Sequence, residues 1–285
     1  MRINIAKHFL NRMPMRHAFS LVELSIVLVI LGLLTGGILT GQSLIRAAEL
    51  RSVVTEYQRY QTAIHSFRDR YFALPGDMRN ATAFWGFAGG STGTDAACYT
   101  STTGTGTQTC NGDGDGLIIN SGSGNTYRER FMFWQHLANA GLIQGSYSGI
   151  AGSANSYDHE TTNSPLGKIG SSMWSVYNSS NTVHSGATSV FNGVYPSQIT
   201  FGAIVADVDP YGNLLSPEEM WNIDTKLDDG LPAQGKITPR MRANCTVAAN
   251  GSAITTSAAD AAKLDAKYNL TDTSKACSII FRNSW

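Results

Sequence analysis

The chain has 285 residues with 21 basic and 21 acidic side chains, so its formal net charge at pH 7 is zero. This balance gives no electrostatic support for nucleic-acid binding, because nucleic-acid-binding domains concentrate positive charge on one face. The six histidines form no metal-ligand pair and no serine lies in a nucleophile elbow, so the sequence does not predict an enzyme.

The first predicted element is a membrane-length helix that follows a short basic segment. Residues 1–18 carry four basic side chains and no acidic one, and residues 24–45 carry no charge. This uncharged run approaches the roughly 20 residues that span a bilayer as a helix. It is longer than the apolar core of a cleaved secretory signal, which has about 7–15 residues. The positive residues predict that the N-terminal end lies in the cytoplasm.

Glu23 lies just inside this apolar segment. An ionised side chain within a membrane helix costs about 3 kcal/mol on insertion scales, and such a residue usually has a partner. The alternative is a position at the membrane interface, where the carboxylate reaches the lipid headgroups. The physical argument alone leaves both interpretations open.

The residues around Glu23 resemble a known family. Residues 19–23, FSLVE, after a basic leader and before an apolar helix, are similar to the leader junction of type IV pilins and type II secretion pseudopilins. The resemblance implies that a prepilin peptidase cleaves between Ala18 and Phe19 and N-methylates Phe19. It also implies that Glu23 pairs with the new α-amino group of a neighbouring subunit in a filament. Two departures from the family are Ala18, where glycine is usual, and the lack of proline in the apolar helix.

Beyond the apolar segment, the pattern predicts that the helix continues. Apolar side chains recur at alternating spacings of three and four residues, which is one face of a helix: Leu50, Val53, Tyr57, Tyr60, Ile64, Phe67 and Tyr71. A coiled coil has a similar repeat, but this stripe is short and rich in tyrosine. It ends where Pro75 and Gly76 stop a helix. We therefore divide the chain into a cleaved leader, a membrane-spanning and filament-core helix, its amphipathic continuation and an extracytoplasmic head, at residues 1–18, 19–45, 46–72 and 73–285.

The sequence of the head predicts an α+β fold, in which the long N-terminal helix packs against an antiparallel β-sheet. Stretches rich in glycine, serine and threonine predict long surface loops at residues 89–126, 144–172 and 178–190. Helices are predicted at residues 127–141 and after the capping box of Ser216 and Glu219. Strands are predicted at residues 173–177, 191–195, 198–206 and 278–282. Helices and strands do not alternate regularly, which favours an antiparallel sheet.

The four cysteines predict two disulfides, because their number is even and the head is predicted to be exported. Three connectivities are compatible with the sequence. We favour Cys98–Cys110, which closes a loop rich in glycine and threonine. The second pair, Cys245–Cys277, resembles the C-terminal disulfide loop of many type IV pilins. Free buried thiols are the alternative.

Residues 111–118, NGDGDGLI, match the first two-thirds of a calcium-binding loop. Asn111, Asp113 and Asp115 stand at positions 1, 3 and 5, with glycine at position 6 and an aliphatic residue at position 8. Gly122 replaces the usual glutamate at position 12, and Glu129 is the candidate substitute. The sequence therefore predicts Ca²⁺ as a cofactor, with a solvated glycine-rich turn as the alternative.

A second acidic group follows the helix predicted to start at Ser216. Asp224, Asp228 and Asp229 precede Gly230, and turn formation explains the Asp-Asp-Gly sequence well. A metal-ligand role is the alternative.

The sequence thus predicts a structural subunit of a type IV pilus or pilus-like filament. One alternative is a type II secretion pseudopilin, and another is a minor or tip pilin whose head acts as a calcium-stabilised adhesin. The size of the head favours a minor or specialised subunit, and Glu23 argues against the tip-most pseudopilin, which lacks that carboxylate. The predicted partners are identical or related pilin subunits, the prepilin peptidase, the inner-membrane assembly platform and the membrane. The predicted location is the inner membrane before assembly and a periplasmic or cell-surface filament afterwards.

Overall fold

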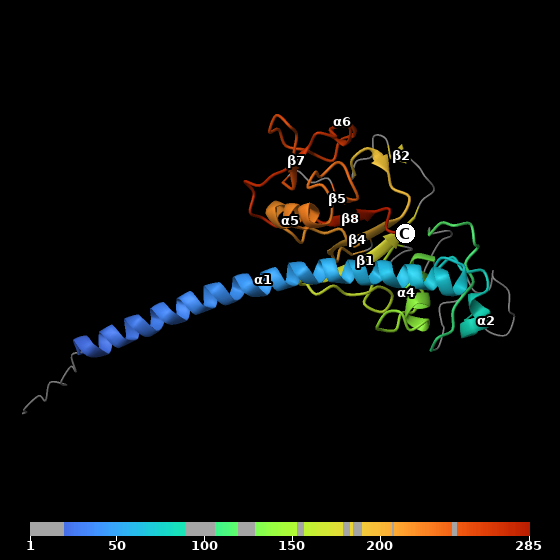
Figure 1. Ribbon diagram of the computed structural model, residues 1–285, viewed down its shortest axis with the longest axis horizontal. Coiled ribbons are helices and arrows are strands. Elements are labelled where there is room, and N and C mark those ends of the chain that lie inside the picture. The colour runs from blue at the N-terminus through green and yellow to red at the C-terminus, as the bar shows by residue number, and fades with distance from the viewer. Residues whose placement is uncertain are drawn as a thin grey trace, which may run out of the picture. The chain divides into compact units, whose positions relative to one another are not determined.

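The predicted α+β fold is confirmed by the structure, a computed structural model of the chain (Figure 1). It combines the long helix α1 (Leu21–Tyr71) with a four-stranded antiparallel sheet. The chain forms two compact units, the first ending at Ala48 and the second running from Glu49 to Trp285. The structure describes residues 20–88, 106–118, 129–152, 157–178, 183–184, 190–206, 208–240 and 244–285.

In the first unit, α1 carries apolar side chains that are exposed along its surface. Leu21 is 86% exposed and Leu39 is 68% exposed. Hydroxyl groups in this segment donate to carbonyls three or four residues earlier, as in the bonds from Thr35 to Leu31 and from Thr40 to Gly36, each 2.9 Å long. A helix that bonds its own polar groups suits an apolar solvent. By length and composition, α1 is able to cross a membrane.

In the second unit, the predicted apolar stripe of α1 is confirmed as a core face. The side chains of Val53, Tyr57, Tyr60, Ile64 and Phe67 are buried, and Leu50 and Tyr71 pack at the edge of the same core. Burial of a large side chain stabilises the fold by roughly 1.5–3 kcal/mol. The second half of α1 is therefore part of the hydrophobic core of the head and stabilises its fold.

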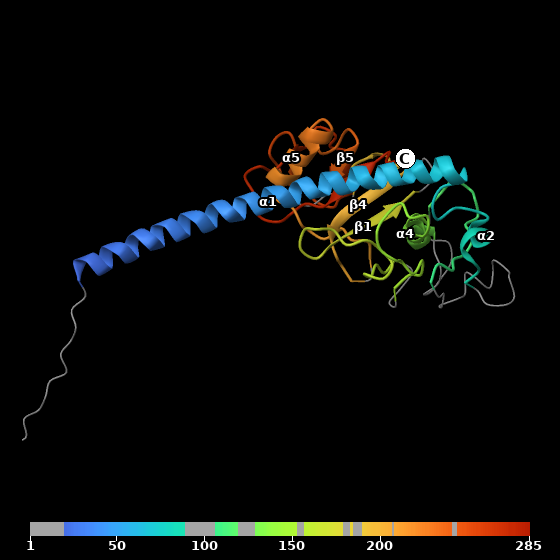
Figure 2. The same ribbon diagram turned by 60° about the horizontal axis from the view of Figure 1, so that its bottom comes forward.

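The sheet has the strand order β1-β4-β8-β5 and is antiparallel throughout. Trp174 lies opposite Phe201, and Ile199 lies opposite Phe281, so these side chains share one face of the sheet. That face packs in the same core as α1, and Figure 2 shows the second half of α1 beside β1 and β4. The four strands are β1 (Ser172–Tyr177), β4 (Gln198–Ala203), β8 (Ile279–Arg282) and β5 (Ile237–Pro239).

Three strand predictions are close to the observed elements, and one differs. The strand expected at residues 191–195 is reduced to β3 (Gly193–Val194), which pairs with β2 (Val183–His184) outside the main sheet. Tyr195 turns inward instead, and its hydroxyl donates to the carbonyl of Phe191 at 2.9 Å. The three-residue strand β5 was not predicted, because so short a run carries no periodic signal.

Helix α4 (Glu129–Asn139) is buried more completely than the sequence predicts. Four consecutive apolar side chains project from different sides of the helix, and none has exposed surface: Phe131, Met132, Phe133 and Trp134. Polar side chains of α4 such as Arg130 and Gln135 are buried as well, so the helix is covered on all sides. The segment after α4 supplies part of that cover, since the ring of His159 lies 4.9 Å from that of Phe131. The expectation of a surface loop across residues 144–172 is wrong for buried residues such as His159 and Ser164.

The capping box predicted at the start of α5 (Pro217–Leu227) is present. Ser216 Oγ accepts from the Glu219 N–H at 3.2 Å, and Glu219 Oε2 accepts from the Ser216 N–H at 2.9 Å. Two donors that α5 leaves unpaired at its start are satisfied in this way. The remaining short elements are α2 (Ala81–Trp85), α6 (Ala258–Ala261), β6 (Thr246–Val247) and β7 (Lys267–Tyr268).

The predicted disulfide between Cys245 and Cys277 is present, with a Cα–Cα distance of 5.2 Å. Both residues are fully buried, and the carbonyl of Cys277 accepts from the N–H groups of Leu214 and Leu215. Cys98 lies outside the described residues, so the Cys98–Cys110 disulfide stays a prediction.

The double substitution Cys245→Ala and Cys277→Ala is expected to lower the free energy of unfolding by about 2–5 kcal/mol, because the cross-link restricts the unfolded chain. Urea denaturation of the full-length chain in detergent, followed by tryptophan fluorescence, measures this loss. The Cys245→Ala variant alone is the control, since it already lacks the bond and is expected to lose most of the same stability. Equal midpoints for the wild type and the double variant contradict the prediction.

Candidate functional site

Glu23 lies in the first turn of α1, where its carboxylate caps the helix. Glu23 Oε2 accepts from the Ser20 N–H at 2.9 Å, and Ser20 Oγ accepts from the Val22 N–H at 3.3 Å. This exchange resembles a capping box and favours the carboxylate beside the positive pole of the helix. It keeps the acidic group at the end of α1 that adjoins Phe19. Ala18 and Phe19 themselves lie outside the described residues.

The comparison with protein families decides what this segment is. A sequence model of the prokaryotic N-terminal methylation motif matches residues 13–39. This motif is the signature of type IV pilins and pseudopilins. No curated protein and no solved structure matches the chain, so the head of this pilin-like protein is described from its own geometry. The signature and the apolar helix together support membrane anchoring before assembly with other pilin subunits.

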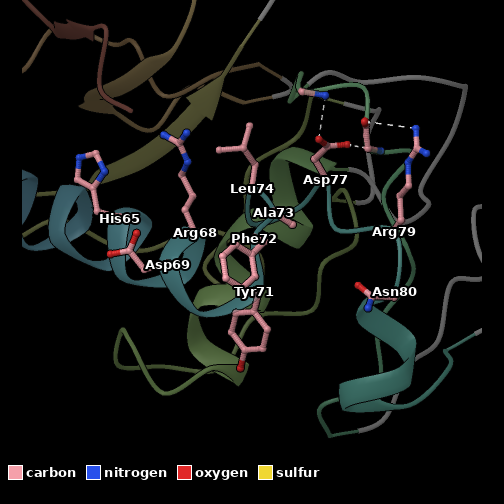
Figure 3. Close-up of a pocket in the computed structure, with 12 residues that line it drawn as sticks. His65, Arg68, Asp69, Tyr71, Phe72, Ala73, Leu74, Asp77, Arg79 and Asn80 are labelled. Atoms are coloured by element: carbon pink, nitrogen blue, oxygen red, sulfur yellow. Dashed lines mark hydrogen bonds between the residues drawn. The ribbon is translucent and has the colours of Figure 1, made fainter.

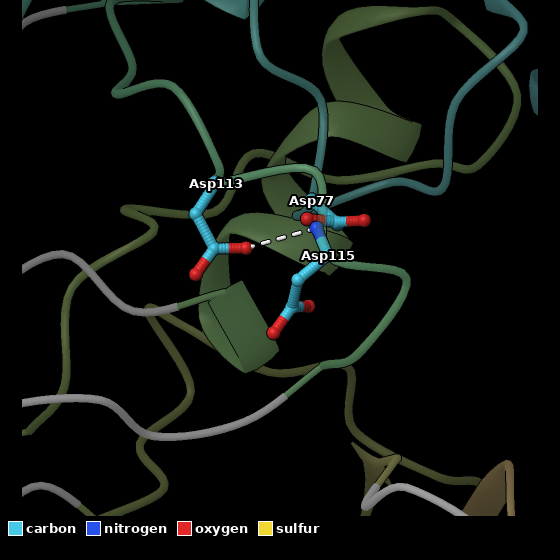
Figure 4. Close-up of side chains that lie close together, drawn as sticks. All are labelled: Asp77, Asp113 and Asp115. Atoms are coloured by element: carbon cyan, nitrogen blue, oxygen red, sulfur yellow. Dashed lines mark hydrogen bonds between the residues drawn. The ribbon is translucent and has the colours of Figure 1, made fainter.

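The head of the pilin-like chain brings three aspartates together (Figure 4). One carboxylate oxygen each of Asp77, Asp113 and Asp115 lies within 4.8 Å of the others. Asp113 and Asp115 belong to the predicted calcium loop, whereas Asp77 lies in the turn after α1. The sequence analysis missed Asp77 as a ligand candidate, because no spacing rule connects that turn with the loop.

The other two predicted calcium ligands have different partners. Asn111 Oδ1 accepts from the N–H and the hydroxyl of Thr82, at 2.9 and 3.1 Å, near the start of α2. Glu129 is buried, and its Oε1 accepts from the Asp113 N–H at 3.4 Å. The cluster that the structure assembles is therefore not the set expected from the sequence, since Asp77 stands beside Asp113 and Asp115.

Backbone N–H groups hold Asp77 in place. Its Oδ1 accepts from Gly114 at 2.5 Å and its Oδ2 accepts from Gly116 at 2.9 Å. Burial raises the pKa of Asp77 to about 6, and the carboxylates of Asp113 and Asp115 add to this shift, while the two N–H groups oppose it. The cluster thus concentrates negative charge that its own hydrogen bonds offset only in part.

Asp77 also lines an open cleft of about 940 Å³ near the C-terminal end of α1 (Figure 3). Arg68 and Asp69 lie along α1 on one side, and Arg79 lies on the other. The Arg79 Nε donates to the carbonyl of Asp113 at 2.6 Å, so this arginine supports the backbone of the loop.

A second aspartate cluster lies where α5 ends. One carboxylate oxygen each of Asp224, Asp228 and Asp229 lies within 4.8 Å of the others. The predicted turn is present, since Asp229 Oδ1 accepts from the Leu231 N–H at 2.8 Å. Asp224 is buried, and its Oδ2 accepts from the Tyr268 hydroxyl at 2.7 Å. Burial raises the pKa of Asp224 to about 7, with the neighbouring carboxylates adding to the shift and the Tyr268 hydroxyl opposing it.

His136 is a packing residue of the pilin-like head. Its Nδ1 accepts from the Gly76 N–H at 2.9 Å, and its Nε2 lies 2.9 Å from the Thr109 hydroxyl. Full burial lowers the pKa of His136 to about 3, so the ring is neutral at pH 7. Because Nδ1 accepts a hydrogen bond from the backbone of Gly76, His136 joins α4 to the turn after α1. The pilin signature likewise indicates a structural family.

Proposed function

We propose that this chain is a structural subunit of a type IV pilus or pilus-like filament, processed by a prepilin peptidase and assembled through α1. The observation that carries the proposal is the methylation motif at residues 13–39, which includes Glu23 and the first part of α1. The exposed apolar side chains of that part need an apolar partner. The bilayer covers them before assembly, and the helices of neighbouring subunits cover them in the filament.

In this proposal, Glu23 selects the position of each incoming subunit. Its carboxylate pairs with the N-methylated α-amino group of Phe19 in a neighbouring subunit. Two opposite charges neutralise each other in an apolar filament core, whereas either one alone is strongly destabilising there. The capping contact with Ser20 supports this role, because it holds the carboxylate at the correct end of α1.

Processing by a prepilin peptidase tests the proposal. After co-expression with the peptidase, mass spectrometry is expected to find a mature chain that begins at Phe19 and carries one added methyl group. The Ala18→Gly variant, which has the usual residue of the family, is the positive control. An intact wild-type leader under conditions in which Ala18→Gly is cleaved contradicts the proposed processing.

Immunogold labelling separates the pilus subunit from the alternatives. Signal along surface filaments supports a main subunit, and signal at filament tips supports a minor one. Filaments that form only when a type II secretion system is overproduced support a pseudopilin, which shares the same N-terminal helix.

A second candidate function is that of a minor subunit whose head is a calcium-stabilised adhesin, and the Asp77 cluster favours it. Ca²⁺ takes six to eight oxygen ligands and accepts carboxylates together with water. Asp77, Asp113 and Asp115 fit this chemistry, because three carboxylate oxygens converge and two of the residues are exposed. We therefore assign a Ca²⁺ role to these three residues in place of the set that included Asn111 and Glu129.

The double substitution Asp113→Asn and Asp115→Asn tests this site. Asparagine keeps the oxygen acceptors for the N–H groups of Asp115 and Leu117, so the turn is expected to fold. A ligand at 100 times its Kd stabilises the folded state by about 2.7 kcal/mol per site. The wild type is therefore expected to gain more thermal stability from Ca²⁺ than this variant. Asp265→Asn, at an exposed position, is the matched control, and an equal gain in all three proteins contradicts the assignment.

A further inference from the structure

The aspartates at the end of α5 occupy an electrostatically unfavourable position. Asp224 lies in the last turn, Asp228 is the C-cap and Asp229 follows it. The C-terminal pole of a helix carries partial negative charge, which repels carboxylates and attracts cations. In the described part of the chain, no lysine or arginine forms an ion pair with any of the three. Lys226 lies in the same last turn but does not pair with the cluster, so the three carboxylates have no counter-charge in direct contact among the described residues.

Asp224 supplies a second, independent observation. Its side chain has no exposed surface, and its Oδ2 accepts from Tyr268. Its Oδ1 is also buried and has no hydrogen-bond partner of normal geometry among the described residues, although the Gly230 N–H lies near enough to the carboxylate to lower its pKa. An ionised carboxylate has about four acceptor sites, and a buried one that is only partly satisfied is costly. A cation beside Oδ1 removes this deficit.

The loop after α5 closes around the other two carboxylates. Asp228 Oδ2 accepts from the N–H groups of Lys236 and Ile237, which joins the loop to β5. A Cβ atom at Gly235 would overlap Asp228 Oδ2 and lie 2.9 Å from Asp229 Oδ2. Glycine at this position, with φ +65°, thus leaves room for both oxygens on one side of the loop.

We propose that Asp224, Asp228 and Asp229 form a Ca²⁺ site that joins the end of α5 to the loop preceding β5. The donors are hard carboxylate oxygens, which suit Ca²⁺ and Mg²⁺ rather than softer metals. The arrangement favours Ca²⁺, because Mg²⁺ demands a near-ideal octahedron and Ca²⁺ tolerates an irregular shell completed by water. This inference does not depend on the filament role, since it concerns the head alone.

Turn formation alone does not explain the cluster. The hydrogen bond from the Leu231 N–H needs only Asp229, and the bonds to Lys236 and Ile237 need only Asp228. An asparagine in either place makes the same bonds without the charge. Neither turn requires a third, buried carboxylate at Asp224.

The test uses the full-length chain in detergent with the Asp77 cluster disabled by Asp113→Asn and Asp115→Asn. In this background we expect calorimetry to show one Ca²⁺ bound per chain and the thermal midpoint to rise with Ca²⁺. Adding Asp228→Asn and Asp229→Asn keeps the backbone hydrogen bonds and is expected to weaken binding by about tenfold or more. Asp265→Asn, added instead, is the matched control and is expected to leave the binding unchanged.

Two results overturn the proposal: no Ca²⁺ binding in the Asp113→Asn and Asp115→Asn background, or full binding after Asp228→Asn and Asp229→Asn are added. If the fourfold variant fails to fold, hydrogen exchange in the background variant decides instead. Ca²⁺ is then expected to slow exchange at the amides of Lys236 and Ile237, and unchanged exchange at both also overturns the proposal. Mg²⁺ in place of Ca²⁺ is expected to bind more weakly, and tighter binding of Mg²⁺ contradicts the choice of ion.

Discussion

Replacing Glu23 with alanine is expected to abolish filament assembly while the head stays folded. In the proposed filament, the change leaves the α-amino group of a neighbouring subunit buried without its counter-charge. Breaking a buried ion pair in this way costs about 3–5 kcal/mol. Because every subunit repeats the loss, the expected result is an absence of filaments in electron micrographs of sheared cell-surface material. The thermal midpoint of the head, measured on the solubilised chain, is expected to stay unchanged.

Two further variants separate charge pairing from helix capping at Glu23. Glu23→Gln keeps an oxygen that accepts from the Ser20 N–H but removes the charge, and it is expected to fail in assembly as Glu23→Ala does. Glu23→Asp keeps the charge on a shorter side chain and is expected to assemble in part. Normal filament numbers from Glu23→Gln would show that capping alone matters and would refute the pairing mechanism.

The substitution Trp174→Ala is expected to lower the free energy of unfolding of the head by about 3–5 kcal/mol. Trp174 has no exposed surface, and its ring lies 5.3 Å from that of Tyr60 and 6.0 Å from that of Phe281, measured between centroids. Its Nε1 also donates to Glu56 Oε2 at 3.0 Å. Alanine therefore creates a cavity between α1 and the sheet and removes a donor from a carboxylate whose pKa is already raised by burial.

Chemical denaturation followed by far-ultraviolet circular dichroism measures this loss. Trp221→Ala is the matched control, because Trp221 is 38% exposed on α5, and its replacement is expected to cost less than about 1 kcal/mol. Trp174→Phe keeps most of the apolar volume and is expected to fall between the two. Equal losses for Trp174→Ala and Trp221→Ala would contradict the assignment of Trp174 to the core.

The long helix was predictable because its signals are local. Residues 24–45 form an uncharged run, and the side chains from Val53 to Phe67 repeat with helical spacing, so neighbouring residues carry the information. The capping box of Ser216 and Glu219 was predictable for the same reason. Helix α4 differs, because its burial depends on residues such as His159, whose ring lies 4.9 Å from that of Phe131 and which comes from a later segment without an apolar pattern.

The predicted calcium loop shows the same limit for a candidate site. A linear motif identified Asp113 and Asp115, since they lie two residues apart. The motif also included Asn111, whose side-chain oxygen accepts from the Thr82 N–H in α2. It also missed Asp77, which reaches the loop through the close packing of Gly112 on the Asp77 backbone. Contacts between segments distant in sequence decide these positions, and spacing does not encode them.

The hydroxyl groups in the first part of α1 affect how easily this segment moves from lipid into a bundle of helices. Thr35, Thr40 and Ser43 bond to carbonyls of their own helix and need no donor or acceptor outside it. Moving this segment from lipid into a bundle of like helices therefore breaks none of these bonds. The free energy of the exchange then depends mainly on van der Waals contact and on Glu23. In the proposed filament, Glu23 is then the polar side chain of this segment whose partner changes when the helix leaves the bilayer.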